Sequence, residues 1–436
     1  MTGPAGTTRG ELLRQLAVAA ELEQGLCLQY LFTAATVKDR IDEGGLTDTE
    51  LLAARTWKGT MNFIAAQEML HLAQVCNLAL AVGGVPYLGR PNFPQRPDYY
   101  PTGLPWGLWP FQQQVVELYA CYERPATWHR PPPDWLPLVE PADRAFPALL
   151  ADAPPAKDPF AHLPGRFDRP QATGHETIGQ LYAAIAEAFS ALPGVIVGDP
   201  ARQLDGRTMG IPQLVRVVDV PSALAAIELI VEQGEGLADD RPDSHFGAFL
   251  GIRRQLLEFS RRADFRPARE VAANPLSRLH VDNTFPGWRL ITDPYTRAVN
   301  DLNSETYRVM LDLLQLVLGD GDAASGAAAL RVMTGVIAPL AEALTQLPMG
   351  DDGSPGEADR PRFAGPSFEV DYPSPPCPPP PAGRLIAADR LRSCAAEAGR
   401  LASLGRAAEV GHGQATVLAA AAGNLADIAR QLAPAT

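Results

Sequence analysis

Two long segments near the start of the chain carry apolar residues at helical spacing, and they constrain the fold more than any other feature. The first segment runs from Glu11 to Val37, with apolar residues recurring every three or four positions. The second begins at the capping sequence Thr47-Asp48-Thr49-Glu50 and continues to Val82, where Gly83-Gly84 ends it. We therefore expect a mainly α-helical protein organised around two long helices.

The second of these segments contains the sequence Glu68-Met69-Leu70-His71. A carboxylate and an imidazole three residues apart lie on one helix face and can bind one ion, a spacing used by di-metal carboxylate bundles. The same face is apolar, so the Glu68 carboxylate is expected to point into the protein. A buried carboxylate needs a cation, a hydrogen-bond network or a proton. The apolar residues of this face are Met61, Ile64, Ala65, Leu72 and Val75.

Glu23 occupies an equivalent position on the first helix. The residues at offsets of three, four and seven are apolar or aromatic, and they are Leu16, Ala19, Ala20, Leu26, Cys27 and Tyr30. Two inward carboxylates suggest a shared metal site, and the alternative is a structural network with an arginine such as Arg55. Tyr30 lies on the same face as Glu23, either as a radical-relay residue beside the site or as a core tyrosine satisfied by one hydrogen bond.

The rest of the chain alternates helical segments with proline-rich loops. Long irregular loops are expected at 86–110 and 131–170, and a proline-rich connector at 373–381. Helices are expected at 111–124, 176–192, 221–234, 245–262, 301–318, 323–347, 385–404 and 414–432, with a short hairpin within 194–220. We assign residues 1–265 to a bundle with loop insertions and residues 266–436 to a C-terminal helical extension packed on it.

Composition excludes several classes of function. A net charge of −13 opposes broad binding to nucleic acid or to an anionic membrane. The five cysteines lack CxxC spacing, which disfavours a disulfide framework and a structural zinc site. No nucleotide-binding motif is present, and neither a leader peptide nor an apolar run of membrane-spanning length is evident, so we expect a cytoplasmic protein.

Several short motifs, in order along the chain, resemble one family. They are Ala20-Glu21-Leu22-Glu23 with Tyr30-Leu31, Tyr122-Glu123-Arg124-Pro125, the segment from Ile230 to Gly236, Ser244-His245-Phe246, Asp293-Pro294-Tyr295, Asn300-Asp301-Leu302-Asn303 and the segment from Ala364 to Phe368. Together with Glu68 and His71, they resemble the ferritin-like domain of the iminophenyl-pyruvate dimer synthases, which act in violacein, rebeccamycin and staurosporine-type pathways. The resemblance implies a ferritin-like four-helix bundle with long proline-rich insertions and additional C-terminal helices.

The resemblance also implies a set of metal ligands. Glu23, Glu68 and His71 would be the ligands of the first two helices. Glu123 is the best candidate from the third helix, with Glu187 as its substitute. The fourth helix departs from the ferritin pattern because it has no second ExxH, and Glu228, Glu232 and Glu235 share one face instead. We expect Glu235 and His245 as ligands and Glu232 as a bridging or supporting acid, the alternative being an exposed acidic face.

Carboxylate and imidazole ligands favour iron or manganese. We expect non-heme iron, as one or two ions, with manganese as second choice and heme disfavoured because no CxxCH motif is present. By resemblance, the protein would be an oxidoreductase that uses dioxygen to couple a small imino or 2-oxo acid. The competing hypothesis is a non-catalytic metal- or heme-binding protein within a biosynthetic complex.

Two further expectations concern the loops and the C-terminal helices. The loop tryptophans would form the wall of a substrate pocket, and they are Trp106, Trp109, Trp128 and Trp135. The alanine-rich C-terminal helices permit close packing, either as an extension of the bundle or in a homodimer.

Overall fold

The structure of the protein is a computed structural model. It describes residues 8–95, 104, 106–125, 175, 177–206, 210, 212–234, 243–280, 287–351, 362–371, 376–407 and 412–433. The loop expected at 131–170 lies outside these residues, as does Glu235.

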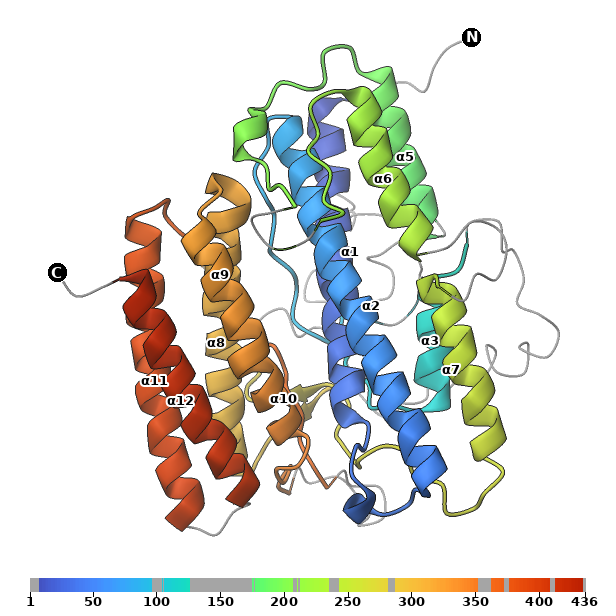
Figure 1. Cartoon of the computed structure of the whole chain (residues 1–436), viewed down its shortest axis with the longest axis vertical. Helices are drawn as coiled ribbons and strands as arrows, with labels where there is room; N and C mark the ends of the chain where they lie inside the picture. Colours follow the sequence, from blue (N-terminus) through green and yellow to red (C-terminus); the bar gives the residue numbers. More distant parts are fainter. Residues whose placement is uncertain are drawn as a thin grey trace, which may run out of the picture.

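The two long helices predicted from the sequence are confirmed and form the centre of the molecule. Helix α1 spans Arg9–Thr36 and helix α2 spans Asp48–Ala81, and the two pack against each other over their length (Figure 1). The short 3-10 helix η1, Ile41–Glu43, lies in the connection between them. Most side chains of both helices are buried, including the apolar residues predicted to surround Glu23 and Glu68.

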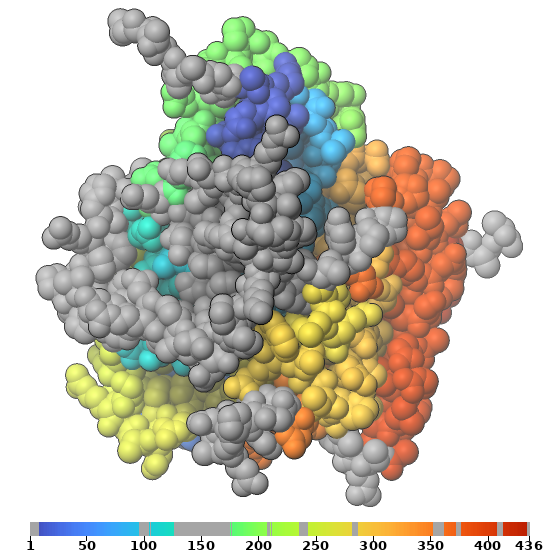
Figure 2. All heavy atoms as spheres, turned by 180° about the vertical axis from the view of Figure 1, so that it is seen from behind, coloured from blue at the N-terminus to red at the C-terminus, as the bar shows by residue number. Residues whose placement is uncertain are grey.

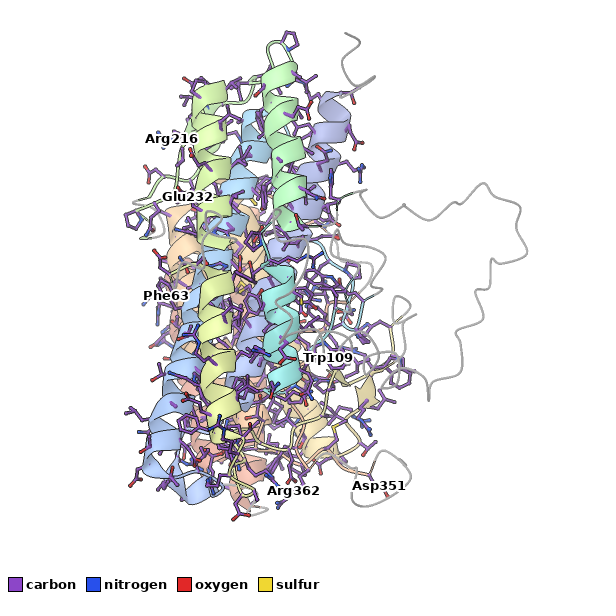
Figure 3. The ribbon with its side chains drawn as sticks, turned by 90° about the vertical axis from the view of Figure 1, so that its right-hand side faces the viewer. Phe63, Trp109, Arg216, Glu232, Asp351 and Arg362 are labelled. Atoms are coloured by element: carbon purple, nitrogen blue, oxygen red, sulfur yellow. The ribbon has the colours of Figure 1, made fainter. Side chains whose placement is uncertain are left out.

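The third and fourth positions of the bundle are each occupied by two short helices in line rather than by one long helix. Helix α3, Gln113–Tyr122, lies below α5, Ile178–Ala191, and α6, Val220–Gly234, lies above α7, His245–Phe259 (Figures 1 and 3). Helix α3 packs against α7 and helix α5 packs against α6. Both positions are therefore interrupted at the middle of the bundle.

The C-terminal helices form a second layer beside α1 and α2 (Figure 1), and they make up one side of the molecule when it is seen from behind (Figure 2). The layer consists of α8 (Pro294–Asp320), α9 (Ala323–Val332), a π-helical segment η3 (Met333–Ile337), α10 (Ala338–Leu344), α11 (Ala382–Ala407) and α12 (His412–Leu432). Two-residue parallel strands, β1 (Pro275–Leu276) and β2 (Arg289–Leu290), precede it.

Two details of this layer differ from the sequence prediction. Helix α8 begins at Pro294 instead of 301, because Asp293 caps it by accepting from the Thr296 N–H and proline suits a first-turn position. The helix expected at 323–347 is divided by the π-helical segment. Among the described residues, only the run 323–344 has the length and composition to cross a membrane, and half of its most apolar window is buried, as in a core helix.

The hairpin expected within 194–220 is not present in the described part of that segment, which contains only the 3-10 helix η2 (Pro200–Arg202). Side chains satisfy the backbone groups that a partner strand would have paired. Gln74 and Asn77 of α2 bond to the backbone of Val215 and Leu204, and Gln203 bonds to that of Val217.

A buried carboxylate brings together two of the motifs that carried the family resemblance. Glu369 accepts from the hydroxyl of Ser367 and from the Asn300 amide, which also donates to Ser367. His280 bonds to the other oxygen of Glu369 at 2.9 Å. These contacts hold the segment around Phe368 against α8, so the two motifs fix each other in the C-terminal layer.

The start of α2 allows a test of stability against pH. Thr47 and Glu50 form a capping box, and the Glu50 carboxylate also binds the Arg262 guanidinium through contacts of 2.8 and 2.7 Å. The hydrogen bond from Arg262 lowers the pKa of Glu50 to about 2, against an unfolded value of about 4.3. The ionised form is thus the one that stabilises the fold, and its contribution is lost as the pH falls toward 2.

We expect Glu50→Gln to lower the free energy of unfolding of the metal-free protein by about 1–2 kcal/mol at pH 7. The difference from the unsubstituted chain should narrow steadily between pH 5 and pH 3, as measured by urea denaturation. A difference that stays constant over this range would contradict the assignment of the low pKa to Glu50.

Candidate metal centre

Five of the side chains predicted from the sequence meet at the level where the third and fourth positions of the bundle are interrupted. Glu23 comes from α1, and Glu68 and His71 come from α2. Glu123 is the C-terminal cap of α3, and His245 is the first residue of α7. None of the five is more than 4% exposed to solvent. The end of α3 and the start of α7 therefore place Glu123 and His245 beside the three residues of α1 and α2.

Glu68 lies at the centre of this cluster and faces both imidazoles. Its Oε2 atom is 2.8 Å from Nδ1 of His71, and its Oε1 atom is 3.0 Å from Nδ1 of His245. Glu23 approaches the His71 Nδ1 at 3.5 Å, and Glu123 approaches the His245 Nδ1 at 3.6 Å. The cluster thus consists of two groups, each with two carboxylates and one imidazole, that share Glu68.

The donor set fits metal ions better than it fits a closed hydrogen-bond network. Oε1 of Glu68 and Nδ1 of His245 are buried and close together, yet neither atom takes part in a hydrogen bond among the described residues. Among the described residues, no arginine or lysine pairs with these three buried carboxylates, which require a compensating positive charge. Carboxylate oxygens and imidazole nitrogens suit iron or manganese, and a shared carboxylate is suited to bridging two ions.

Comparison with known proteins shows the family of this chain. A family model described as ferritin-like matches residues 16–254, which include all five residues of the cluster. The chain belongs to the ferritin-like family. A solved ferritin-like protein from Caulobacter vibrioides is 20% identical, with a TM-score of 0.46, over 72% of this chain and 89% of that one.

Two curated relatives of this ferritin-like chain are each 26% identical to it. One is a dichlorochromopyrrolate synthase of Lentzea aerocolonigenes, matched over 85% of this chain and 37% of the relative. The other is a 2-imino-3-(indol-3-yl)propanoate dimerase of Chromobacterium violaceum, matched over 80% of this chain and 34% of the relative. Both names agree with the family resemblance read from the sequence. The chain spans about a third of the length of these relatives.

Burial and mutual charge set the protonation of the ferritin-like cluster. Burial raises the pKa of Glu23 to about 8, with the charge of Glu68 adding to the increase, and burial also raises the pKa of Glu123. Burial opposes ionisation of Glu68 as well, but the positive charges of His245 and His71 outweigh it and hold the pKa of Glu68 well below its ordinary value. Without metal the cluster retains protons at neutral pH, so metal binding has to displace them.

Two tyrosines donate hydrogen bonds to Glu23 and Glu123, which lie at the two ends of the cluster and are called its terminal carboxylates. The Tyr30 hydroxyl donates to Oε1 of Glu123, and the Tyr182 hydroxyl donates to Oε1 of Glu23. In both cases the second oxygen of the carboxylate faces a histidine. Tyr30 was expected on the face of Glu23, either beside the site or as a core tyrosine with one hydrogen bond, and it is a buried tyrosine whose hydroxyl binds Glu123. Tyr182 was not predicted, although it lies on the apolar face of its helix with Ile178 and Ile185.

Two glutamines contact the Nε2 atoms of the imidazoles, on the side away from the carboxylates, and neither was predicted from the sequence. Oε1 of Gln233 lies 2.9 Å from Nε2 of His71, and Oε1 of Gln67 lies 3.1 Å from Nε2 of His245. Gln67 directly precedes Glu68 in the sequence, so its proximity to the predicted motif was the available signal. Gln233 lies in the segment from Ile230 to Gly236 that carried part of the family resemblance, but a glutamine there has no spacing that marks it as a contact of His71.

The fourth-helix acids are placed differently from the sequence prediction. Glu232 is exposed and points away from the bundle on α6 (Figure 3), so its expected role as a bridging or supporting acid is corrected. Glu228 is exposed too, because Ala223, Ala226, Ile227 and Ile230 form the buried face of this helix. Glu235, the other expected ligand, lies outside the described residues.

Two alternatives from the sequence analysis are resolved by the structure. Glu187, the substitute for Glu123, is exposed on α5. Arg55 is exposed on α2 and donates to the backbone oxygen of Asp39, so it does not neutralise Glu23 or Glu68. The acids of the cluster consequently have only the two imidazoles as cationic partners among the described residues.

A small cavity adjoins the cluster at the helix breaks. Ile178 and Gly179 line it from α5, and Ile230, Val231 and Gly234 line it from α6. It offers about 20 Å³ to water centres, close to what one water molecule needs. The predicted tryptophan wall is not part of it, because Trp106 and Trp109 are buried in the core, with Trp106 stacked on Tyr122. Trp128 and Trp135 lie outside the described residues.

Proposed function

We propose that this chain is a metal-dependent oxidoreductase that couples two molecules of a small imino acid derived from an aromatic amino acid. The observation that carries the proposal is the Glu68-centred cluster, in which three buried carboxylates and two imidazoles face one another without a closed hydrogen-bond network. The relatives named as a synthase of dichlorochromopyrrolate and as a dimerase of 2-imino-3-(indol-3-yl)propanoate support the substrate class.

Five residues would hold the metal. Glu23, Glu68 and His71 would bind one ion, and Glu68, Glu123 and His245 would bind the second. Iron bound there would supply the redox chemistry that accepts electrons from the substrate and passes them to dioxygen. Manganese is the second choice of metal. Glu235 stays a proposed additional ligand, since it directly follows Gly234 at the cavity.

The overall reaction balances as an oxidative dimerisation. One carbon–carbon bond forms between two substrate molecules, and the pair loses two electrons and two protons. Dioxygen, the proposed oxidant, accepts both and leaves as hydrogen peroxide. Burial of the cluster excludes bulk water from the ligands, and the high pKa of Glu23 leaves a carboxyl that can hold a proton near the site before metal binding.

Tyr30 and Tyr182 act in this proposal as positioning residues. Each hydroxyl holds one oxygen of a terminal carboxylate, so the other oxygen stays directed toward a histidine and the metal position. The radical-relay role predicted for Tyr30 is compatible with its direct contact with Glu123, and a Tyr30→Phe variant separates the two roles. Loss of metal affinity alone indicates positioning, whereas a lost radical signal with intact affinity indicates relay.

The decisive experiment uses the full chain loaded anaerobically with ferrous iron. The imine of indole-3-pyruvate would be generated from L-tryptophan by an amino-acid oxidase, which releases one peroxide per imine. Catalase is therefore omitted, and peroxide from dimerisation is measured as the excess over a reaction with the oxidase alone. We expect about two irons per chain and a product with the mass of two substrates minus two hydrogens. A Soret band in place of bound non-heme iron would favour the heme-binding alternative, and absence of any dimer would contradict the proposed reaction.

The cavity provides a separate test of where dioxygen approaches, because it has room for about one water molecule and not for an indole ring. Val231 is half-buried on α6 at the cavity, so Val231→Trp should fill it. We expect retained iron and a roughly tenfold rise in KM for dioxygen. Leu224→Trp, on an exposed position of the same helix, is the matched control. Equal KM values for the two variants would place the entry elsewhere.

A further inference from the structure

We propose that Gln67 and Gln233 are the positioning residues of the two histidine ligands, each one fixing the tautomer and orientation of a single imidazole and so tuning one metal site. The proposal rests on the metal-binding function proposed above. It concerns residues that lie outside the proposed ligand set.

The geometry is the same on both sides of the cluster. His71 lies between Oε2 of Glu68 at Nδ1 and Oε1 of Gln233 at Nε2, with distances of 2.8 and 2.9 Å. His245 lies between Oε1 of Glu68 at Nδ1 and Oε1 of Gln67 at Nε2, with distances of 3.0 and 3.1 Å. Each ring therefore has an oxygen of Glu68 facing Nδ1 and an amide oxygen facing Nε2, and in both rings the amide is on the side away from the carboxylates.

The two contacts cross between helices. Gln67 belongs to α2 and binds the histidine of α7, whereas Gln233 belongs to α6 and binds the histidine of α2. Because the chain between Gly234 and His245 interrupts the fourth position of the bundle, this reciprocal pair connects α2 to both helices that flank the break. The contacts thus fix the two imidazoles relative to each other, with ring centroids 5.5 Å apart.

The chemistry of an amide oxygen selects one tautomer. A carbonyl oxygen accepts hydrogen bonds and cannot donate, so Nε2 of each neutral ring carries the proton and the Nδ1 lone pair is directed toward Glu68 and the terminal acid. A partner at the second nitrogen of a ligating histidine fixes its orientation and typically changes metal affinity 10- to 100-fold when removed. An amide provides this without adding a fourth negative charge to the three carboxylates.

The test requires backgrounds in which a single site remains. Glu123→Ala should leave the site of Glu23, Glu68 and His71, and Glu23→Ala should leave the site of Glu68, Glu123 and His245. Each background is combined with Gln233→Leu, with Gln67→Leu, or with Gln114→Leu, an exposed glutamine on α3 that serves as control. The readout is the dissociation constant and the visible ligand-field spectrum of bound cobalt(II), measured by titration.

We expect each glutamine substitution to weaken only the site whose histidine that glutamine contacts. Gln233→Leu should weaken cobalt binding about 10- to 100-fold in the Glu123→Ala background and leave the Glu23→Ala background unchanged, and Gln67→Leu should do the reverse. Gln233→Glu and Gln67→Glu keep an acceptor and should restore affinity and spectrum. A circular-dichroism melt confirms that each variant is folded.

Two outcomes would overturn the proposal, and a third would contradict the proposed metal-dependent function instead. Equal affinities for the leucine variants and the Gln114→Leu control would show that the amides do not position the imidazoles. Equal losses in both backgrounds would show a general effect on packing. If the unsubstituted chain binds no cobalt or iron, the proposed metal centre itself fails, independently of the glutamines.

Discussion

Replacing Glu68 with alanine is expected to abolish binding of both metal ions at once. Glu68 is the single carboxylate that contacts both histidines, at 2.8 and 3.0 Å, and it belongs to both groups of ligands. Its removal leaves each site with one carboxylate and one imidazole from the described residues, too few to hold iron or manganese tightly. Metal analysis after desalting should fall from about two ions per chain to none, with loss of oxidative coupling.

The terminal acids should behave differently from Glu68. Glu23→Ala and Glu123→Ala each remove a ligand from one group only, so each is expected to lower the stoichiometry to about one ion per chain. Glu187→Ala and Glu232→Ala, at exposed positions on α5 and α6, are the matched controls and should retain both ions. If Glu68→Ala still binds one ion tightly, the shared-carboxylate arrangement is wrong, whatever the activity of the variant.

Metal content can be separated from folding in these variants. Glu68→Gln keeps the volume of the side chain and removes its charge, so it should fold like the parent and still lose metal. In the metal-free state, loss of the central carboxylate also removes the group that stabilises both imidazolium ions, so the pKa of His245, raised to about 9 by Glu68 and Glu123 against the effect of burial, should fall. Histidine resonances followed by NMR titration would measure that change.

The site residues on the two long helices α1 and α2 could be predicted from sequence patterns within each helix. Glu68 and His71 are three residues apart on a long helix, so helical geometry alone placed them on one face. Glu23 followed from the same argument applied to α1. In both cases the burial that the pattern predicted is present, at 1% exposure for each of the three residues. Periodicity was sufficient because both helices run through the site without interruption.

The other half of the site depends on where helices end. Glu123 and His245 reach the cluster because α3 stops at Tyr122 and α7 starts at His245, with Ser244 capping α7 through the Gly247 N–H. Glu232 was expected to point inward because it shares one helix face with Glu228 and Glu235, but Ile227 and Ile230 belong to the buried apolar face of α6, so Glu232 is exposed. Contacts between residues far apart in the chain, such as that of Tyr182 with Glu23, cannot be predicted from a local sequence pattern.

The division into a bundle, residues 1–265, and a C-terminal extension, residues 266–436, stays a proposal, and one residue at the boundary tests it. Arg269 is 5% exposed and lies at the junction of the two layers. Its guanidinium binds Glu43 at 2.6 Å and Asp39 at 3.3 Å, both in the segment after α1, and Glu342 of α10 at 2.5 Å. It also donates to the backbone oxygen of Ala35.

Replacing Arg269 with methionine is expected to destabilise the protein by about 3 kcal/mol, because Glu43 loses its ion-pair partner in a partly dry environment, while Asp39 and Glu342 keep their contacts with Lys58 at 2.8 and 2.6 Å. The value lies at the low end of the range for a broken buried ion pair, since Lys58 remains and the side chains of Asp39 and Glu342 are 34% and 28% exposed and can be hydrated in part. Urea denaturation of the metal-free protein measures the change. Glu43→Gln in the same chain should recover part of the lost stability, by removing the charge that Arg269 had compensated.

Arg266→Met is the matched control for this junction. Arg266 is exposed three residues earlier, and its guanidinium binds only the backbone oxygens of Ala263 and Phe265 among the described contacts. Loss of this side chain should therefore cost less than about 0.5 kcal/mol. If the two layers are joined mainly through Arg269, the methionine variant should also broaden the urea unfolding transition or divide it into two steps. Added metal should then stabilise only the step in which the bundle unfolds. A single transition lowered by less than about 1 kcal/mol would mean that the apolar contacts between the layers, and not this cation, hold the extension on the bundle.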